Sequence, residues 1–342
     1  MDSELHIVVP GICGPLAETH SIQDSPVLKN WVSVLAKSNR TSSASNVYDV
    51  TRSILNLSIE GDFPSAALSL LANNLYDDAL FYMHADPVHL RAELDHAVLT
   101  SYVDLDIKET ESADIYHTLN NHFHDDGLSF FCVNKKHWFV SSKNDILLDT
   151  TPLLEAVGRN VNFLLPAGYD QSAWKQTLTE SQMLMHMHEV NETRENSGQQ
   201  TINSLWFYGS GRLQKKDIDI NHICSHDDLY KGLAKYYRCD FDEIPSNVSS
   251  YQDMLLTKNS GGRYLLHMSQ LQNLTNYTDV SMWLEELTVV LNDWLYPLIS
   301  FANKNNIKVI LYPCDGNEYH FGRLDGFKFW CKGKVEEYVT RY

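Results

Sequence analysis

Short apolar runs, each followed by a helical pattern, constrain the fold of this chain most strongly. Residues 5–10 (LHIVVP) and 79–90 (ALFYMHADPVHL) are mostly apolar and lack the alternation of a strand with one face in water. Residues 25–37 carry apolar positions at helical spacing between them. This order predicts an α/β fold, with a doubly wound, mainly parallel sheet and helices on both faces. A third run, at 203–208, is expected to join the same sheet.

The pattern of apolar and polar residues changes near residue 110. A helix closed by Gly127 precedes two short strand-like runs, LSFFCV and HWFVSS, which read as a hairpin. We therefore expect a small inserted α+β subdomain at 110–170, with the α/β core formed by 1–109 and 171–342. The stretch MLMHMHEVNETRE falls on a long helix expected at 171–196. There His186 and His188 would point about 200° apart, so we expect core methionines and no metal site.

The composition of the chain restricts the kinds of partner that it is expected to bind. The 342 residues carry a formal net charge of −17, which disfavours nucleic acid and anionic membrane surfaces. Six cysteines without a C-x-x-C pair are typical of reduced thiols, and neither a signal-peptide pattern nor an 18-residue apolar window is present. We expect a cytoplasmic protein whose partners are a phosphorylated small molecule or another protein.

The stretch NSLWFYGSGRL is a candidate anion site. A Gly209-x-Gly211 turn after a strand, with Arg212 behind it, can bring backbone N–H groups and a cation to a phosphate. The motif lacks the third glycine of a dinucleotide fingerprint and the lysine of a P-loop. A tight turn that requires positive φ explains the same spacing.

A second candidate follows the apolar run at 79–90. Asp86, His89 and Arg91 come at its carboxyl end, where catalytic, phosphate-binding or metal-binding groups commonly lie. A structural role, in which Asp86 caps a turn, stays open. The stretch HFHDDG at 122–127 contains several residues of the types that bind metal ions. Its position favours a solvent-exposed helix end instead.

Five ordered stretches together resemble a known family: ADPVHLRAELDHAVL, LNNHFHDDGL, the hairpin ending in HWFV, LPAG…W…ESQMLMHMHEVNETRE and NSLWFYGSGRL. They are similar to bacterial proteins labelled cofactor-independent phosphoglycerate mutase-related or regulatory protein RpfE, relatives of the archaeal-type mutases of the alkaline phosphatase superfamily. The resemblance covers most of 80–213. It implies an alkaline phosphatase-like α/β core with an inserted lid.

The chain departs from the active enzymes where they bind metal. Active members have Asp-Gly directly after the first strand, whereas this chain has Pro10-Gly11. Ser65 is the nearest analogue of their serine nucleophile, in a different context. At the later metal-binding strands the chain offers only His267 and Asp315. The resemblance therefore implies an inherited fold with an eroded phosphoryl-transfer centre.

Three functions are compatible with these residues. The first is a non-catalytic regulatory or phospho-ligand-binding relative without a cofactor, in which Arg91, Gly209, Gly211 and Arg212 bind the ligand. The second is an active mutase or phosphatase with Mn or Zn, in which Ser65, Asp86 and His89 are catalytic candidates and His267 and Asp315 metal ligands. The third is a protein-interaction module.

Overall fold

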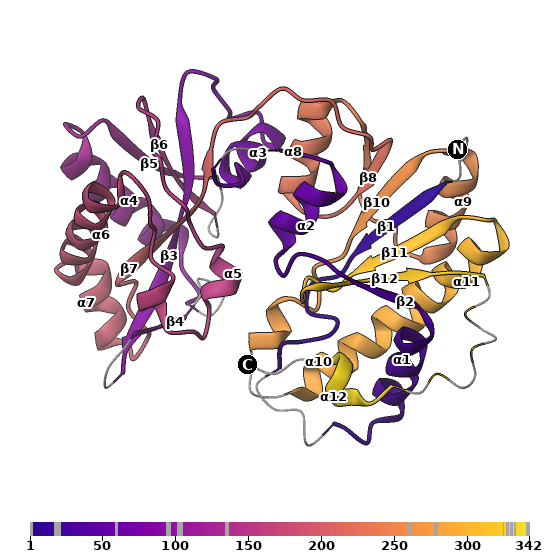
Figure 1. Ribbon diagram of the computed structural model, residues 1–342. Helices are drawn as coiled ribbons and strands as arrows, with labels where there is room; N and C mark the ends of the chain where they lie inside the picture. Colours follow the sequence, from indigo (N-terminus) through magenta and orange to yellow (C-terminus); the bar gives the residue numbers. More distant parts are fainter. Residues whose placement is uncertain are drawn as a thin grey trace. The chain divides into compact units, whose positions relative to one another are not determined.

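The computed structural model describes residues 3–16, 22–58, 61–93, 97–100, 105–133, 137–258, 261–276, 280–323, 325, 328, 331 and 333–339. The chain divides into two compact units (Figure 1). The first combines Met1–Ser58 with Lys216–Tyr342, and the second is Ile59–Lys215.

The first unit is built on a seven-stranded sheet. Its strands lie in the order β2-β12-β11-β1-β10-β8-β9. The five strands from β11 to β9 are parallel, and β12 and β2 add an antiparallel edge. This mostly parallel sheet confirms the α/β fold class. The strands are β1 (Glu4–Val8), β2 (Asn39–Ser42), β8 (His222–Cys224), β9 (Asp240–Asp242), β10 (Arg263–His267), β11 (Lys308–Tyr312) and β12 (Asn317–Phe321).

Helices cover both faces of this sheet. Leu5 and Ile7 of β1 face a core formed with α1, α9, α10 and α11, whereas His6 points to the opposite face because strand side chains alternate. On that opposite face α2 and α8 are joined by a 2.8 Å hydrogen bond between Thr51 Oγ1 and Tyr230 Oη. The helices are α1 (Pro26–Lys37), α2 (Val47–Ile54), α8 (Asp228–Tyr237), α9 (Val248–Lys258), α10 (Val280–Val289), a π-helical turn (Val290–Leu295), α11 (Tyr296–Lys304) and α12 (Val335–Tyr338), with a 3₁₀ turn at Asn273–Asn276.

The second unit is built on a five-stranded antiparallel sheet. The order is β4-β3-β6-β5, and β7 also pairs with β3. The strands are β3 (Phe81–Ala92), β4 (Ala97–Thr100), β5 (Leu128–Cys132), β6 (Trp138–Ser142) and β7 (Ser204–Gly211). The helices are α3 (Ser65–Ala72), α4 (Glu109–Phe123), α5 (Leu153–Ala156), α6 (Gln171–His186) and α7 (Glu189–Asn196), with a 3₁₀ turn at Val161–Phe163.

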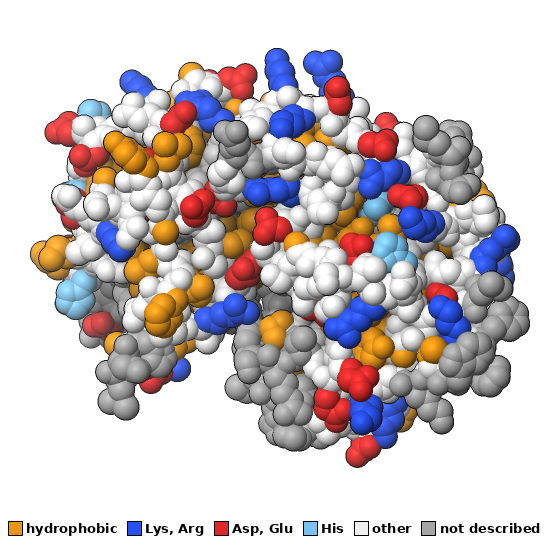
Figure 2. Space-filling view, in the orientation of Figure 1, with side chains coloured by type: hydrophobic (Ala, Val, Ile, Leu, Met, Phe, Trp, Pro, Cys, Tyr) orange, Lys and Arg blue, Asp and Glu red, His pale blue; other side chains and the backbone are white. Residues whose placement is uncertain are grey.

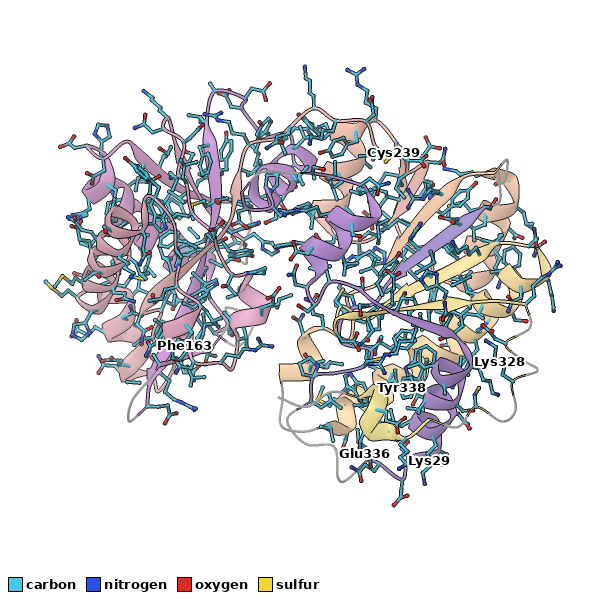
Figure 3. All side chains as sticks on the ribbon, viewed as in Figure 1. Lys29, Phe163, Cys239, Lys328, Glu336 and Tyr338 are labelled. Atoms are coloured by element: carbon cyan, nitrogen blue, oxygen red, sulfur yellow. The ribbon has the colours of Figure 1, made fainter. Side chains whose placement is uncertain are left out.

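Two helical layers enclose this second sheet. Phe81, Met83 and Ala85 of β3 pack toward α4 and α6, whereas Tyr82 packs toward α3 on the other face. Figure 3 shows the side chains filling the space between helices and sheet in each unit. Phe163, labelled there, is an exception because 86% of its surface is exposed.

The structure corrects the expected strand assignment. The runs at 79–90 and 203–208 become β3 and β7 of the antiparallel sheet and do not join the parallel one. Their continuous apolar pattern arises because helices cover both faces of this sheet, a setting that the pattern alone does not distinguish from a parallel sheet. The second unit consequently spans Ile59–Lys215, wider than the insertion expected at 110–170.

The helix expected at 171–196 is also interrupted. It divides into α6 and α7, and the Nδ1 of His188 accepts a hydrogen bond from the N–H of Val190 at the start of α7. The hairpin of β5 and β6 is confirmed, although its turn lies outside the described residues.

Charge on the surface is mixed. On the face shown in Figure 2, Lys and Arg side chains are interspersed with Asp and Glu. Within the described ranges, every helix is too short or not apolar enough to span a bilayer.

Candidate functional site

The carboxyl edge of the parallel sheet is where an open α/β fold ordinarily binds ligands. His267 ends β10 at this edge and is only 2% exposed. Its Nδ1 lies 3.0 Å from Ser225 Oγ, and its ring stacks on Tyr230 with 4.2 Å between the centroids. Burial lowers the pKa of His267 to about 4, against a weaker opposing effect of Asp227. His267 is therefore a neutral, packed imidazole.

Asp315 follows β11 at the same edge. Its Oδ1 accepts hydrogen bonds from the backbone N–H and the Nδ2 of Asn317, at 3.0 and 3.1 Å. Burial raises the pKa of this carboxyl, and the hydrogen bonds from Asn317 oppose the shift. The carboxylate is thus held within its own loop.

The loop after β1 packs closely against other residues of the first unit. Trp283 Nε1 donates to the carbonyl oxygen of Gly11 at 2.8 Å. Gly11 has a φ of +83°, and a Cβ placed on it would come within 2.9 Å of Leu271 O and Thr275 Cγ2. No side chain in this loop contributes a carboxylate before Cys13, because residues 9–12 are Val, Pro, Gly and Ile.

These side chains do not converge on a metal centre of the kind that the active enzymes have. Two divalent cations need several converging carboxylates and imidazoles. Across the described ranges, no group of three or more His, Cys, Asp or Glu side chains could hold a metal ion. The described residues therefore do not fit a two-metal centre, and His267 and Asp315 are not joined by further ligands.

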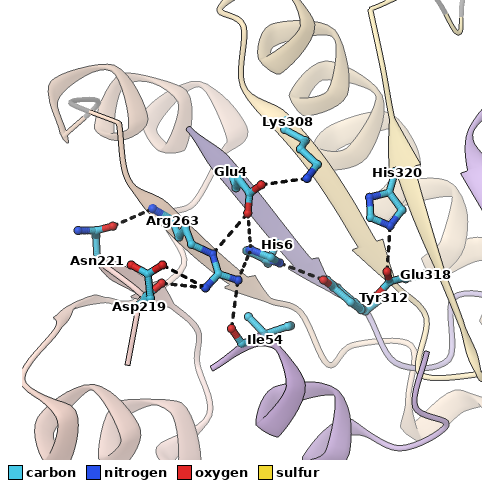
Figure 4. Close-up of polar contacts among 10 residues, drawn as sticks. All are labelled: Glu4, His6, Ile54, Asp219, Asn221, Arg263, Lys308, Tyr312, Glu318 and His320. Atoms are coloured by element: carbon cyan, nitrogen blue, oxygen red, sulfur yellow. Dashed lines mark hydrogen bonds and ion pairs between the residues drawn. The ribbon is translucent and has the colours of Figure 1, made fainter. Parts of the chain in front are cut away.

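A second polar network runs across the same strands, from Glu4, Arg263 and Lys308 at their amino ends to Tyr312 at the end of β11 (Figure 4). Arg263 Nη2 donates to His6 Nε2 at 3.1 Å, which leaves the proton on Nδ1 to donate to Tyr312 Oη at 3.0 Å. Glu4 accepts from Lys308 Nζ at 2.9 Å and pairs with Arg263 at 3.4 Å. Burial, with help from Arg263, lowers the pKa of His6 to about 4. This network ties β1, β10 and β11 together.

In the second unit, partners within the protein already occupy the Gly-x-Gly turn. Gly209, with φ of +68°, donates its N–H to Thr150 Oγ1 at 2.9 Å. The N–H and the hydroxyl of Ser210 each donate to Asp62 Oδ2 at 3.3 Å, and Thr150 donates to the same oxygen. Burial raises the pKa of Asp62 to about 6, although these hydrogen bonds act in the opposite direction. Gly211, with φ of +139°, pairs with Tyr82.

The two predicted cations lie far apart along β3. Arg212 Nε donates to Asp145 at 2.6 Å, and its Nη1 donates to the carbonyls of Asp78 and Leu80, just before β3 begins. Arg91 lies near the other end of β3, where it pairs with Glu93 and its side chain is 64% exposed. The structure thus brings Arg212 close to the glycine turn and leaves Arg91 apart from it.

Ser65 and His84 meet at the turn. Ser65 begins α3, and its Oγ lies 1.9 Å from the point that a Cβ on Gly209 would occupy. The ring of His84 lies 3.1 Å from the same point and stacks on Tyr208 at 4.4 Å between the centroids. Ser65 Oγ and His84 Nδ1 are both buried without a hydrogen-bond partner among the described residues. Burial, together with the nearby His137, holds the pKa of His84 well below its usual value.

Asp86 and His89 anchor strands. Asp86 is fully buried and accepts hydrogen bonds from the N–H of Trp138 at 3.0 Å and from Tyr208 Oη at 2.7 Å. Burial raises the pKa of Asp86 to about 6. His89 Nδ1 lies 2.9 Å from the carbonyl oxygen of Thr201. Among the predicted residues, Ser65, Asp86 and Gly209 therefore share one polar cluster, which His89 does not join.

Sequence patterns alone did not reveal Asp62 and Thr150 in this cluster. His84 stands in the same candidate stretch as Asp86, and residues two apart on a strand share a face, but the sequence assigned His84 no role of its own. Asp62 and Thr150 come from separate loops that carry no local signal. Ser65 Oγ and His84 Nδ1 are not hydrogen-bonded to one another, so the cluster places a buried hydroxyl near an imidazole without the hydrogen bond that joins a nucleophile to its base.

Known proteins support the mutase part of the resemblance. The 2,3-bisphosphoglycerate-independent phosphoglycerate mutase of Methanosarcina mazei is 23% identical over 250 residues, covering 65% of this chain and 62% of that enzyme. The enzyme of the same name from Methanosarcina barkeri is 23% identical over 203 residues, covering 52% and 51%. The chain thus spans only about half to three-fifths of these curated relatives. No protein-family model matches.

One solved structure supports the fold. The PH0037 protein from Pyrococcus horikoshii aligns with a TM-score of 0.50 and 10% identity, covering 94% of this chain and 87% of that one. A cofactor-independent phosphoglycerate mutase from Thermoplasma acidophilum aligns with a TM-score of 0.41 and 14% identity, covering 94% and 90%. The RpfE-type assignment stays a prediction. The sequence matches make the chain a distant relative of the 2,3-bisphosphoglycerate-independent phosphoglycerate mutases.

Proposed function

We propose that this protein is a non-catalytic relative of the phosphoglycerate mutases, with a binding or regulatory role. The observation that carries the proposal is that the polar side chains at the carboxyl edge of the parallel sheet are already held by partners within the protein. His267 is stacked on Tyr230 and bonded to Ser225, and Asp315 is bonded to Asn317. Each would have to leave its present partners to reach a metal ion, and the loop after β1 offers no carboxylate to join them.

The ligand that we propose is a phosphorylated small molecule, with phosphoglycerate as the first choice. The proposal draws on the names of the relatives, which act on phosphoglycerate. Arg212 is the cation beside the glycine turn, so we propose that it meets the phosphate, in exchange for its surface pair with Asp145. The protein partner and the cytoplasmic location expected from the sequence stay predictions.

Two titrations test this function. In the first, 2- and 3-phosphoglycerate are added to the purified protein in a calorimeter, with Arg212→Leu and Arg91→Leu compared. We expect binding that Arg212→Leu abolishes and Arg91→Leu leaves unchanged. In the second, Mn²⁺ and Zn²⁺ are added, and we expect no stoichiometric binding at the parallel sheet. Tight metal binding that His267→Asn or Asp315→Asn removes would contradict the non-catalytic proposal.

A second candidate function is phosphoryl transfer through Ser65. The observation in its favour is that Ser65 Oγ and His84 Nδ1 are both buried, without a partner among the described residues, and packed against Gly209. In this step the Ser65 hydroxyl turns toward His84, and the neutral imidazole takes its proton as Oγ bonds to the phosphorus atom of phosphoglycerate. The P–O bond to glycerate breaks, and the imidazolium returns the proton to the leaving glycerate oxygen. Phosphoserine at Ser65 after incubation with phosphoglycerate, detected by mass spectrometry and absent from Ser65→Ala, would favour this function over the first.

A further inference from the structure

The carboxyl end of α6, with the residue that caps it, exposes two methionines and a histidine. Met183 is 64% exposed and Met187 is 83% exposed, and His186 between them is exposed as well. This corrects the expectation that the methionines of this stretch pack in the core, which holds only for Met185 at 1% exposure. Because methionine is usually buried, two large exposed thioethers one helical turn apart require an explanation.

The three side chains share one face of the helix. Positions 183, 186 and 187 have the spacing i, i+3 and i+4, which places neighbouring Cβ atoms about 5–6 Å apart. The N–H of Met187 bonds to the carbonyl of Met183 at 3.4 Å, so Met187 is still in helical register. Met side chains have three rotatable bonds and can bring their sulfur atoms together.

The imidazole of His186 is available to a ligand. In the described part of the chain it takes part in no hydrogen bond, ion pair or ring contact. His188 differs, because its Nδ1 accepts from Val190 and its Nε2 lies 3.0 Å from Thr118 Oγ1. The two histidines that the sequence placed on opposite sides thus have different roles.

The donor set fits a soft cation. Thioether and imidazole groups favour Cu(I) over hard divalent ions, which prefer carboxylates and water. We propose that Met183, His186 and Met187 form a surface site for a soft monovalent cation, Cu(I), bound by two thioether sulfur atoms and one imidazole nitrogen.

The test uses the full chain labelled with ¹³C at the methionine methyl groups. Cu(I) buffered by a competing chelator is added without oxygen, and the methyl resonances are followed by NMR. This readout separates the site from the thiols of the six cysteines, which carry no labelled methyl. Met282, 58% exposed on α10, is the internal control. Far-ultraviolet circular dichroism verifies that each variant is folded.

We expect the Met183 and Met187 methyl resonances to shift together and saturate together, before that of Met282 moves. His186→Gln should weaken the apparent affinity by about tenfold. Met282→Leu should leave the affinity unchanged, whereas Met183→Leu should abolish the shift of Met187. The proposal is overturned if all exposed methionines shift at the same Cu(I) concentration, if His186→Gln has no effect, or if only the thiols take up the metal.

Discussion

The hydroxyl of Ser65 occupies the space in which any side chain at position 209 would begin. Its Oγ lies 1.9 Å from the ideal Cβ position of Gly209, and the ring of His84 lies 3.1 Å from it. Gly209 also has a φ of +68°, which side chains of L-residues rarely adopt. Glycine is thus required here for packing and for backbone conformation, and the turn is part of the core between α3 and β7.

This relationship predicts the effect of Gly209→Ala. The left-handed conformation costs about 1–2 kcal/mol for alanine, and overpacking against Ser65 adds about 1–3 kcal/mol. We expect the free energy of unfolding, measured by urea denaturation, to fall by both amounts. Adding Ser65→Ala should recover the overpacking part only. A double variant no more stable than Gly209→Ala would show that Ser65 is not the obstructing group.

The buried His267 predicts a loss of stability in acid. A histidine whose folded pKa is about 4 and whose unfolded pKa is 6.5 binds its proton first in the unfolded state. Its contribution is therefore complete above pH 6.5 and declines as the pH falls toward 4, by roughly 3 kcal/mol at most. His267→Asn, which keeps an acceptor for Ser225, should have a flatter profile between these values. The exposed His226→Asn, measured over the same pH range, is the matched control.

The buried Asp86 predicts a change of opposite sign in the second unit. Its folded pKa of about 6 lies above its unfolded value of 3.8, so the folded state binds the proton more tightly. Its contribution is complete below pH 3.8 and is lost as the pH rises through 6, by roughly 3 kcal/mol at most.

Asp86→Asn tests this carboxyl directly, because asparagine stays uncharged over the whole range. We expect the variant to lose less stability than the wild type between pH 5 and pH 8, measured by urea denaturation at each pH. The exposed Asp126→Asn is the matched control. Equal profiles for Asp86→Asn and the wild type would mean that the hydrogen bonds from Trp138 and Tyr208 hold Asp86 ionised at both pH values.

Arg212 and Arg91 form a matched pair for stability. Arg212 bonds to Asp145 and to two backbone carbonyls, whereas Arg91 forms an exposed pair with Glu93. Arg212→Leu should lower the free energy of unfolding by about 1 kcal/mol, and Arg91→Leu should change it by less than about 0.5 kcal/mol. Equal effects of the two substitutions, measured by urea denaturation, would contradict the tethering role of Arg212.

The sequence was sufficient for the fold class and for most helices, but it misplaced two strands. A continuous apolar run indicates that both faces of a strand are covered. It does not indicate whether the neighbouring strand is parallel or antiparallel. For this reason β3 and β7 were assigned to the parallel sheet. The break between α6 and α7 was missed because His188 caps α7 through Nδ1, and histidine is not a common capping residue.

The candidate site was predictable only in part. Asp86 and Gly209 stood out because they end or follow strong apolar runs, and Ser65 because of the resemblance. Asp62 and Thr150 could not be found. They lie in loops 88 positions apart, and no sequence pattern links one to the other. The separation of Arg91 from Arg212 depends on the antiparallel pairing of β3 with β7, which the sequence did not reveal.

The most direct test of the central claim is a phosphoglycerate mutase assay. The purified protein and the Methanosarcina mazei enzyme would be assayed side by side with Mn²⁺, with the metal content of both measured on the same samples. We predict turnover and bound metal for the Methanosarcina enzyme, and neither for this protein. Turnover accompanied by stoichiometric metal, lost in His267→Asn or Asp315→Asn, would contradict the account and require that the carboxyl edge rearranges into an active centre.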